Sequence, residues 1–367
     1  MVVMIKKNSK REVICTKNND LEGNNTGEQV EAMFWRERQD QVLQCLLCPH
    51  YCVIDEGRIG RCGVRSNKRG VLSPDSYGRV VSIALDPIEK KPLRMFRKGS
   101  KILSIGSLGC NMKCPFCQNY GISMEYEDKI GKSKRLLPIE LVSLVKEIAM
   151  EEAGAQKNVP TMEKACVQKN ISSMEEARAR KSVPAMGDKT INSHQEAGWH
   201  RGRNIGVAYT YNEPLVGYEY VYQCAKQIRK IGLKNVLITN GLINPEPFEV
   251  LLPYIDAMNI DLKSFSEEYY KRLDGNLETV KKIIEMAAKE THLEITTLII
   301  PGENDSEKEM KALASWLGAI NPDIPLHISR FFPAYKYVDK FPTPLDTMYK
   351  LEEVAKKYLN HVFLGNV

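Results

Sequence analysis

The sequence predicts an α/β fold in which parallel strands alternate with helices. Short apolar runs recur along the chain, and the stretches between them show the apolar spacing of amphipathic helices. Several of these helical stretches begin with proline or an acidic residue near the first turn. Strand-helix units in succession form a parallel sheet with helices outside, and six such units close naturally into a partial (β/α)6 barrel of the TIM type.

The elements follow in order along the chain. Strands are expected at 102–105, 205–209, 235–238, 257–261, 293–300 and 326–331, after an earlier strand at 80–85. Helices are expected at 139–150, 215–231, 277–288, 307–317 and 347–359. The connector at 86–93 is expected to be extended, with Lys90 and Lys91 on a solvated face. In such folds the functional side chains collect at the carboxyl ends of the strands.

Composition divides the chain into an arm at 1–30, a cysteine-rich extension at 31–93 and the barrel at 94–367. The arm is polar and is expected to be disordered. The barrel is interrupted at 152–199, where segments starting at Gln156, Gln168 and Arg180 align at a period of 12 residues. This period is too short for the common solenoid repeats, so we expect a surface insertion in which Cys166 binds no metal.

Charge and hydropathy exclude several classes of protein. The 367 residues carry a net charge of only +6 with acids and bases interspersed, so nucleic acid is not indicated as a partner. No apolar run is long enough to span a membrane, and the start of the chain lacks a signal peptide, so a cytoplasmic location is expected. Seven of the ten cysteines form two tight groups, and in a reducing compartment such groups are expected to bind metal rather than to form disulfides.

The extension contains a complete set of metal ligands. Cys45, Cys48, Cys52 and Cys62 have the spacing C-x2-C-x3-C-x9-C, and His50 is an alternative ligand. A closed zinc site would help so short a segment to fold, whereas an auxiliary iron-sulfur cluster would bind the same four thiolates. The spacing does not distinguish zinc from iron-sulfur.

A second group of cysteines follows the first barrel strand. Cys110, Cys114 and Cys117 have the spacing C-x3-C-x2-C, which can hold three corners of a 4Fe-4S cluster and leaves the fourth iron open. No spare fourth cysteine is in sight. A zinc site that lacks one ligand, or a chance spacing, is the alternative.

With Phe116 before its third cysteine, this loop resembles the signature of the radical S-adenosylmethionine (SAM) enzymes. Together with the cysteine-rich extension, the 86–92 segment and the turn Tyr211-Asn212-Glu213-Pro214, it looks most like the radical SAM member of the AmmeMemoRadiSam group, which is related to the pyruvate formate-lyase activating enzymes. The resemblance implies a partial barrel and an oxidoreductase that reductively cleaves SAM to a 5′-deoxyadenosyl radical. It also implies a protein or other macromolecular substrate, and an electron donor such as ferredoxin or flavodoxin.

The resemblance also implies a SAM site at the ends of the strands. Its members are Phe116, Asn212, Glu213, Thr239, Asn240, Asp261, Lys263 and Ser266. The residues alone leave simpler interpretations open, namely a helix cap at Glu213, an ordinary turn at 239–241 and a structural ion pair between Asp261 and Lys263. The loop at 300–305 matches one that lies near the adenine in relatives.

Two further residues depart from the pattern of the activating enzymes. Tyr335 stands near the position where they place a SAM-contacting histidine, and His327, early in its strand, is expected to be a core histidine. Radical chemistry on a small molecule, or a metal-stabilised binding module, are the alternative functions. Relatives continue with a cysteine-bearing tail after Val367, which raises the alternative that this chain is a fragment.

Overall fold

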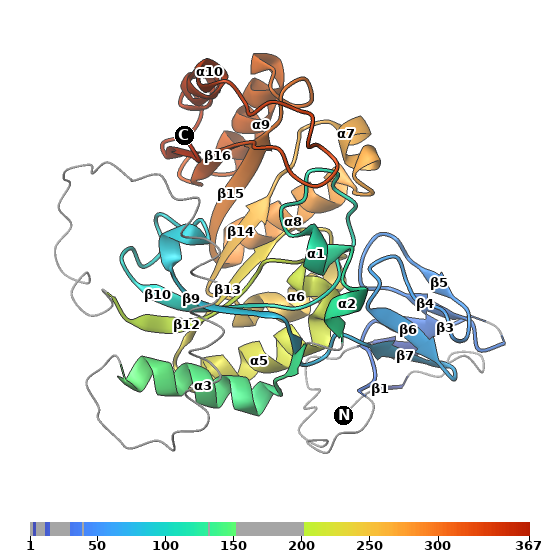
Figure 1. The fold of residues 1–367 in the computed structure, drawn as a ribbon. Helices are drawn as coiled ribbons and strands as arrows, with labels where there is room; N and C mark the ends of the chain where they lie inside the picture. Colours follow the sequence, from blue (N-terminus) through green and yellow to red (C-terminus); the bar gives the residue numbers. More distant parts are fainter. Residues whose placement is uncertain (1–2, 5–11, 15–29, 39, 131–132, 152–201) are drawn as a thin grey trace.

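The computed structural model describes residues 3–4, 12–14, 30–38, 40–130, 133–151 and 202–367. Its main element is an 8-stranded sheet in the order β17-β16-β15-β14-β13-β12-β10-β9 (Figure 1). The strands are β9 (Ser82–Pro87), β10 (Lys101–Gly106), β12 (Asn204–Tyr209), β13 (Lys234–Thr239), β14 (Ala257–Asp261), β15 (His292–Ile299), β16 (Leu326–Arg330) and β17 (Val362–Gly365). Neighbours from β10 to β17 pair in parallel, and β9 pairs antiparallel to β10.

The six predicted barrel strands are confirmed, in the predicted order and direction. The sheet is longer than predicted because β17 adds a parallel strand at one edge and β9 adds an antiparallel strand at the other. β17 was not predicted because the helix expected at 347–359 extends beyond the observed end of α10 (Leu345–Ala355) and leaves few residues for a further strand.

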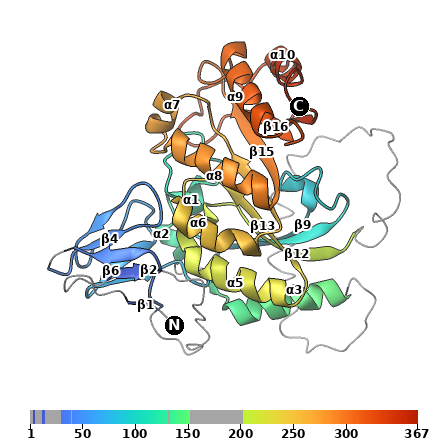
Figure 2. The ribbon, with the colours of Figure 1, turned by 180° about the vertical axis from the view of Figure 1, so that it is seen from behind.

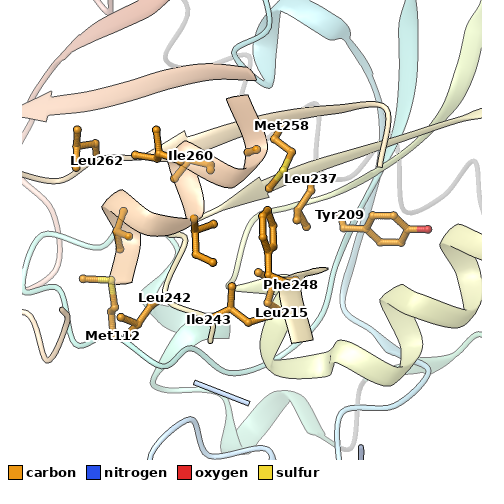
Figure 3. Packing of buried hydrophobic residues seen from close by; sticks show 14 of the residues in the cluster. Met112, Tyr209, Leu215, Leu237, Leu242, Ile243, Phe248, Met258, Ile260 and Leu262 are labelled. Atoms are coloured by element: carbon orange, nitrogen blue, oxygen red, sulfur yellow. The ribbon is translucent and has the colours of Figure 1, made fainter. Parts of the chain in front are cut away.

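Helices cover the outer face of this sheet (Figures 1 and 2). They are α3 (Pro138–Glu151), α5 (Tyr218–Lys230), α6 (Pro245–Leu251), α8 (Leu277–Glu290), α9 (Glu307–Ile320) and α10, with the short α1 (Tyr120–Ser123), α2 (Glu127–Ile130) and α7 (Glu267–Arg272) at the rim. Figure 3 shows Leu237 and Met258 of the sheet beside Phe248 of α6. Burying such side chains stabilises the fold by roughly 1.5–3 kcal/mol each.

A smaller core lies on the inner face of the sheet. In β10, Leu103 and Ile105 belong to the core that contains the helices, while Ile102 packs with Ile88 and Leu93. Because successive strand residues face opposite sides, this second group lies inside the barrel. Ile88 is in a 3-10 turn (Ile88–Lys90), so the connector after β9 folds under the barrel instead of remaining extended as predicted.

This connector also buries a charge pair, which corrects the predicted solvated face. Lys91 is only 4% exposed, and its Nζ lies 2.7 Å from the Asp86 carboxylate. The Tyr211 hydroxyl donates to the same carboxylate at 3.0 Å, and the Lys91 ammonium lies 5.1 Å from the Tyr211 ring centre. Burial alone would raise the pKa of Asp86, but Lys91 and these hydrogen bonds lower it. Only Lys90, which is 62% exposed, faces solvent as predicted.

Substituting Lys91→Met is therefore expected to lower the free energy of unfolding by about 3 kcal/mol or more, because it leaves the buried Asp86 carboxylate without its cation. Urea denaturation measures this change. The matched control is Lys90→Met, which removes an exposed partner of the same carboxylate and should cost about 0–1 kcal/mol. Equal losses in the two variants would contradict the assignment of the buried pair.

The cysteine-rich extension stands beside the barrel as a small β-unit (Figure 2). One sheet contains β1 (Val3–Met4), β2 (Glu12–Ile14), β3 (Trp35–Glu37), β4 (Leu43–Cys45) and β5 (Val53–Ile54), and a hairpin contains β6 (Arg65–Lys68) and β7 (Val71–Pro74). A third pair joins β8 (Arg79–Val80) to β11 (Lys134–Arg135). The arm predicted at 1–30 thus contains two short paired strands. Its other residues, and the insertion predicted at 152–199 with Cys166, lie outside the described residues apart from residue 30.

A buried carboxylate fastens the segment after the connector to the amino ends of the strands. Glu294 in β15 accepts hydrogen bonds from the backbone nitrogens of Arg94 and Met95 and lies 2.9 and 2.6 Å from Nε2 of His292 and His327. Burial raises its pKa, but these donors outweigh burial and lower the pKa to about 2. His327 is 5% exposed and has the packed position predicted for it.

The lowered pKa of Glu294 predicts a pH dependence of stability. A carboxyl group that is more acidic in the folded state contributes stability above its unfolded pKa, near 4.3, and loses it as the pH falls towards 2, for a total of about 3 kcal/mol. The free energy of unfolding, measured by urea denaturation, should fall between pH 5 and pH 3. This fall should be smaller for Glu294→Gln than for the parent protein. Glu290→Gln, at an exposed position on α8, should keep the parental difference.

Candidate functional site

The three predicted cluster ligands lie on one loop, residues 107–119, between β10 and α1; we call it the three-cysteine loop. Cys110, Cys114 and Cys117 are free thiols, and Cys114 is buried. Burial raises the pKa of Cys114 to about 11, and the neighbouring Cys117 adds to the rise. Burial, then Glu213 and Cys114, raise the pKa of Cys110. The three thiols therefore lie close enough on the loop to influence one another's pKa.

Polar side chains from the strand ends hold this loop in place. Asn212, after β12, accepts from the Ser107 nitrogen at 2.9 Å and donates to the Gly109 carbonyl at 3.0 Å. Asn111 donates to the Leu242 carbonyl at 2.7 Å. The predicted SAM residue Asn212 therefore already uses both ends of its amide to position the loop.

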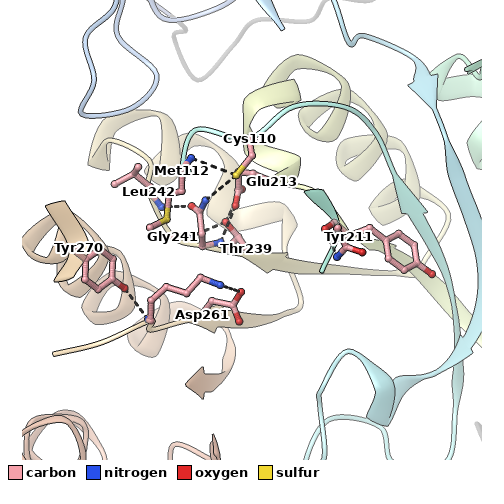
Figure 4. Close-up of polar contacts among 12 residues, drawn as sticks. Cys110, Met112, Tyr211, Glu213, Thr239, Gly241, Leu242, Asp261 and Tyr270 are labelled. Carbon is pink, nitrogen blue, oxygen red and sulfur yellow. Dashed lines mark hydrogen bonds and ion pairs between the residues drawn. The ribbon is translucent and has the colours of Figure 1, made fainter. Parts of the chain in front are cut away.

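Glu213 is the buried acid of the site, at 3% exposure (Figure 4). Its carboxylate accepts from the Leu215 nitrogen at 3.0 Å, the Thr239 hydroxyl at 2.7 Å and the Asn240 nitrogen at 2.8 Å. Burial raises its pKa to about 7 in spite of these donors. No cation among the described residues forms an ion pair with this carboxylate, and a ligand ammonium group would supply one. Glu213 also caps the 3-10 turn Pro214–Gly217, which confirms the predicted cap. The cap and the proposed binding of a ligand involve the same carboxylate.

The turn after β13 connects Glu213 to the cysteines. Asn240 donates from Nδ2 to the Cys110 sulfur at 3.7 Å and to Asn111 Oδ1 at 3.0 Å, and the Met112 nitrogen lies 3.4 Å from the same sulfur (Figure 4). Gly241 has a φ of +70° and lies against Ile260, so a side chain at this position would strain the turn. Donors to a cysteine sulfur are typical of iron-sulfur sites.

Asp261 and Lys263 form a third part of the site at the end of β14. Lys263 Nζ lies 2.6 Å from the Asp261 carboxylate, and both affect the pKa of Cys114, which places them near this sulfur. Burial lowers the pKa of Lys263, but Asp261 and Cys114 raise it above its usual value. The predicted ion pair is present, and it lies beside the predicted cluster ligands rather than apart from them.

Two of the residues predicted to contact SAM, Phe116 and Ser266, make contacts within the protein. Phe116 is buried, with its ring centre 6.0 Å from that of Tyr337. The Ser266 hydroxyl accepts from the Tyr269 nitrogen at 3.3 Å and caps α7. The structure does not bring Ser266 into hydrogen bonds with the cysteines, Glu213 or Asp261.

Sequence reasoning missed two residues that organise the site. Asn304, in the loop predicted to lie near adenine, donates to the carbonyls of Lys263 at 2.9 Å and Leu298 at 2.8 Å. Tyr211 has a φ of +75°, a conformation that costs a non-glycine residue on the order of 1–3 kcal/mol. The ring of Tyr211 points away from Glu213 in Figure 4, towards the buried Asp86. Neither role has a signal in the sequence, since both depend on contacts between distant segments.

The donor set fits an iron-sulfur cluster. Three free thiols lie on one loop, and Asn240 donates to the sulfur of Cys110, as donors do to the ligands of such clusters. Cys45, Cys48, Cys52 and Cys62 line a second space, one cavity in the extension.

Comparison with known proteins places this site in a family. The Radical SAM superfamily model matches residues 166–314, which include the ends of β12, β13 and β14 but not the three-cysteine loop. A Methanocaldococcus jannaschii protein named "Uncharacterized protein MJ0808" is 34% identical over 340 residues, covering 92% of this chain and 85% of that protein. The (2S)-3-sulfopropanediol dehydratase activating enzyme of Klebsiella oxytoca is 22% identical over 57% of this chain and 69% of its own length.

A solved domain of pyruvate-formate lyase-activating enzyme from Bacteroides vulgatus shares 22% identity, with a TM-score of 0.38 over 44% of this chain and 98% of that domain. None of the described helices is long and apolar enough to cross a membrane. The extent and identity of the match to MJ0808, with the superfamily match at the strand ends, decide the family. The chain therefore belongs to one family with the Methanocaldococcus jannaschii protein MJ0808, and it carries a radical SAM domain.

Proposed function

We propose that this chain binds SAM beside a 4Fe-4S cluster held by Cys110, Cys114 and Cys117, and cleaves it reductively. When bound, the cluster supplies the electron that breaks SAM to give a 5′-deoxyadenosyl radical, which takes a hydrogen atom from the substrate. The observation that carries the proposal is the chain of contacts from the Cys110 sulfur through Asn240 to the buried Glu213. These contacts connect Glu213, which has no cationic partner among the described residues, to a loop whose three cysteines would leave one iron of the cluster open.

The residues of the chain have separate tasks in this proposal. Glu213 accepts the ammonium group of SAM, Asn240 donates to the Cys110 sulfur, and Asn212 holds the backbone of the loop. Lys263 and Asp261, beside Cys114, present paired charges to the polar end of the cofactor. The buried strand ends exclude water from the site, which protects a reactive radical.

We further propose that the substrate is a protein or another macromolecule, as in glycyl-radical activation. Relatives named as activating enzymes, such as the Klebsiella oxytoca protein, support this proposal. An external one-electron donor, a ferredoxin or flavodoxin, would supply the electron. Radical chemistry on a small molecule is the alternative.

The test is anaerobic reconstitution with iron and sulfide, followed by addition of SAM and dithionite. The expected product is 5′-deoxyadenosine, measured by liquid chromatography. The assay is repeated with the macromolecular and the low-mass fraction of a cell extract as sources of substrate. If the folded, iron-loaded protein forms no 5′-deoxyadenosine with either fraction, SAM cleavage is refuted. Stimulation by the macromolecular fraction, abolished by protease, would support a protein substrate, whereas stimulation by the low-mass fraction alone would support the small-molecule alternative.

A further inference from the structure

The four cysteines of the extension enclose a cavity of their own. Cys45 ends β4, Cys48 and Cys52 flank the turn before β5, and Cys62 precedes β6. They line one cavity, partly open to solvent, together with His50 and Arg65 of the extension and with barrel residues such as Leu242. All four are free thiols, so no disulfide uses them. We call this the four-cysteine cavity.

Arg65 provides a second and independent sign of a ligand in this cavity. Its guanidinium is 2% exposed and donates from Nη1 to Glu219 at 3.1 and 3.0 Å and from Nη2 to the Met33 carbonyl at 2.8 Å. The remaining donor, Nε–H, is buried and has no partner in the part of the chain that the structure describes. A buried donor is normally satisfied, and a metal-bound thiolate or sulfide would accept from it.

We propose that Cys45, Cys48, Cys52 and Cys62 hold an iron-sulfur cluster, and that Arg65 Nε–H donates a hydrogen bond to one of its sulfur atoms. Four thiolates satisfy a 4Fe-4S cluster completely, so this centre has no open iron, in contrast to the three-cysteine loop.

The alternative occupant of this cavity is a single zinc ion, which the same four thiolates would bind at about 2.3 Å. The two centres differ in their metal count, about four irons for the cluster and one ion for zinc.

The proposed centre lies directly against the three-cysteine loop. His50 Nε2 lies 2.7 Å from the Asn111 carbonyl oxygen; because a carbonyl only accepts, this nitrogen carries the proton and is not free to bind metal. Asn111 itself lines the cavity. A Cβ at Gly109 would lie 2.7 Å from the Cys62 carbonyl oxygen, so the two backbones touch. The centre therefore anchors the extension on the loop that carries Cys110.

The decisive experiment removes the other cysteine group from the full chain. A Cys110→Ala/Cys114→Ala/Cys117→Ala variant, reconstituted anaerobically in buffer that contains iron, sulfide and zinc, is analysed for all three and by electron paramagnetic resonance after reduction. We expect about four irons per chain. Addition of Cys48→Ser should remove this iron, whereas addition of Cys224→Ala, a buried thiol of α5 outside both groups, should not. One zinc without iron, or neither metal, would overturn the proposal, and neither result depends on SAM cleavage.

A second measurement tests Arg65 in the same triple variant. Arg65→Lys keeps the charge but removes the Nε–H donor, and hydrogen bonds to sulfur raise the reduction potential of such clusters, so we expect a more negative midpoint potential at unchanged iron content. Arg69→Lys, the same substitution at an exposed position, is the matched control and should leave the potential unchanged. Equal potentials in the two variants would overturn the role of Arg65. If Arg65→Lys does not fold, the metal count above still decides the centre.

Discussion

Replacement of Cys114 by alanine is expected to reduce 5′-deoxyadenosine formation to the background seen without added SAM. Alanine offers no ligand, and the two thiols that remain on the loop cannot hold three corners of a cluster. Lys263 and Asp261 influence the pKa of Cys114, so this thiol also lies beside the polar groups at the end of β14. Iron content and product formation are measured on the same anaerobic preparation.

Cys224→Ala provides the control for this experiment. Cys224 is fully buried in α5 and takes no part in either cysteine group, so its removal tests the general cost of losing a buried thiol. The control should cleave SAM at the parental rate. A Cys114→Ala protein that also did so would show that the three-cysteine loop does not carry the chemistry.

Substitution of Glu213 by glutamine is expected to weaken SAM binding by at least a hundredfold. Removing one member of a buried, hydrogen-bonded charge pair costs about 2–5 kcal/mol, and glutamine cannot neutralise an ammonium group. Glutamine nearly preserves the shape of the side chain, so the hydrogen bond from the Thr239 hydroxyl can persist at the remaining carbonyl oxygen. Equilibrium dialysis of the iron-loaded protein with radiolabelled SAM measures the dissociation constant.

The raised pKa of Glu213 gives this prediction a pH signature. In the SAM-free protein the carboxyl has a pKa of about 7 because it is buried. Below that value the group is protonated and must release a proton before it can pair with the ammonium group. The dissociation constant of the parent should therefore rise about tenfold per pH unit below pH 7 and level off above pH 8.

The Glu213→Gln variant has no proton to release at this position, so its SAM affinity should vary much less between pH 6 and pH 8. Glu249→Gln, at an exposed position on α6, should retain the parental affinity and the parental pH dependence. If Glu213→Gln bound SAM as tightly as the control, Glu213 would be a helix cap and no more.

The sequence alone predicted the barrel and the ligand spacing of its first loop. An apolar run such as 257–261 predicts a buried strand from its own composition. The spacing of Cys110, Cys114 and Cys117 is likewise a local property of one loop. The order and direction of the six strands also followed, since strand-helix alternation restricts the topology. These features depend on neighbouring residues, which is why periodicity and spacing reveal them.

Only the tertiary structure shows which side chains make contacts between segments that lie far apart in the sequence. Nothing near Lys91 in the sequence shows that its ammonium group is buried against Asp86 and Tyr211, and the pattern around it is that of a surface connector. Likewise, the sequence around Asn212 does not show that its amide holds the backbone of Ser107 and Gly109.

The same division applies to the extension. The sequence predicted that Cys45, Cys48, Cys52 and Cys62 form one ligand set, and the structure places all four along one cavity. Only the folded chain could place His50 against Asn111 and leave the Nε–H of Arg65 buried without a partner. The physical reason is that spacing fixes which side chains can meet within a loop, whereas burial and hydrogen-bond satisfaction are set by the segments that pack across it.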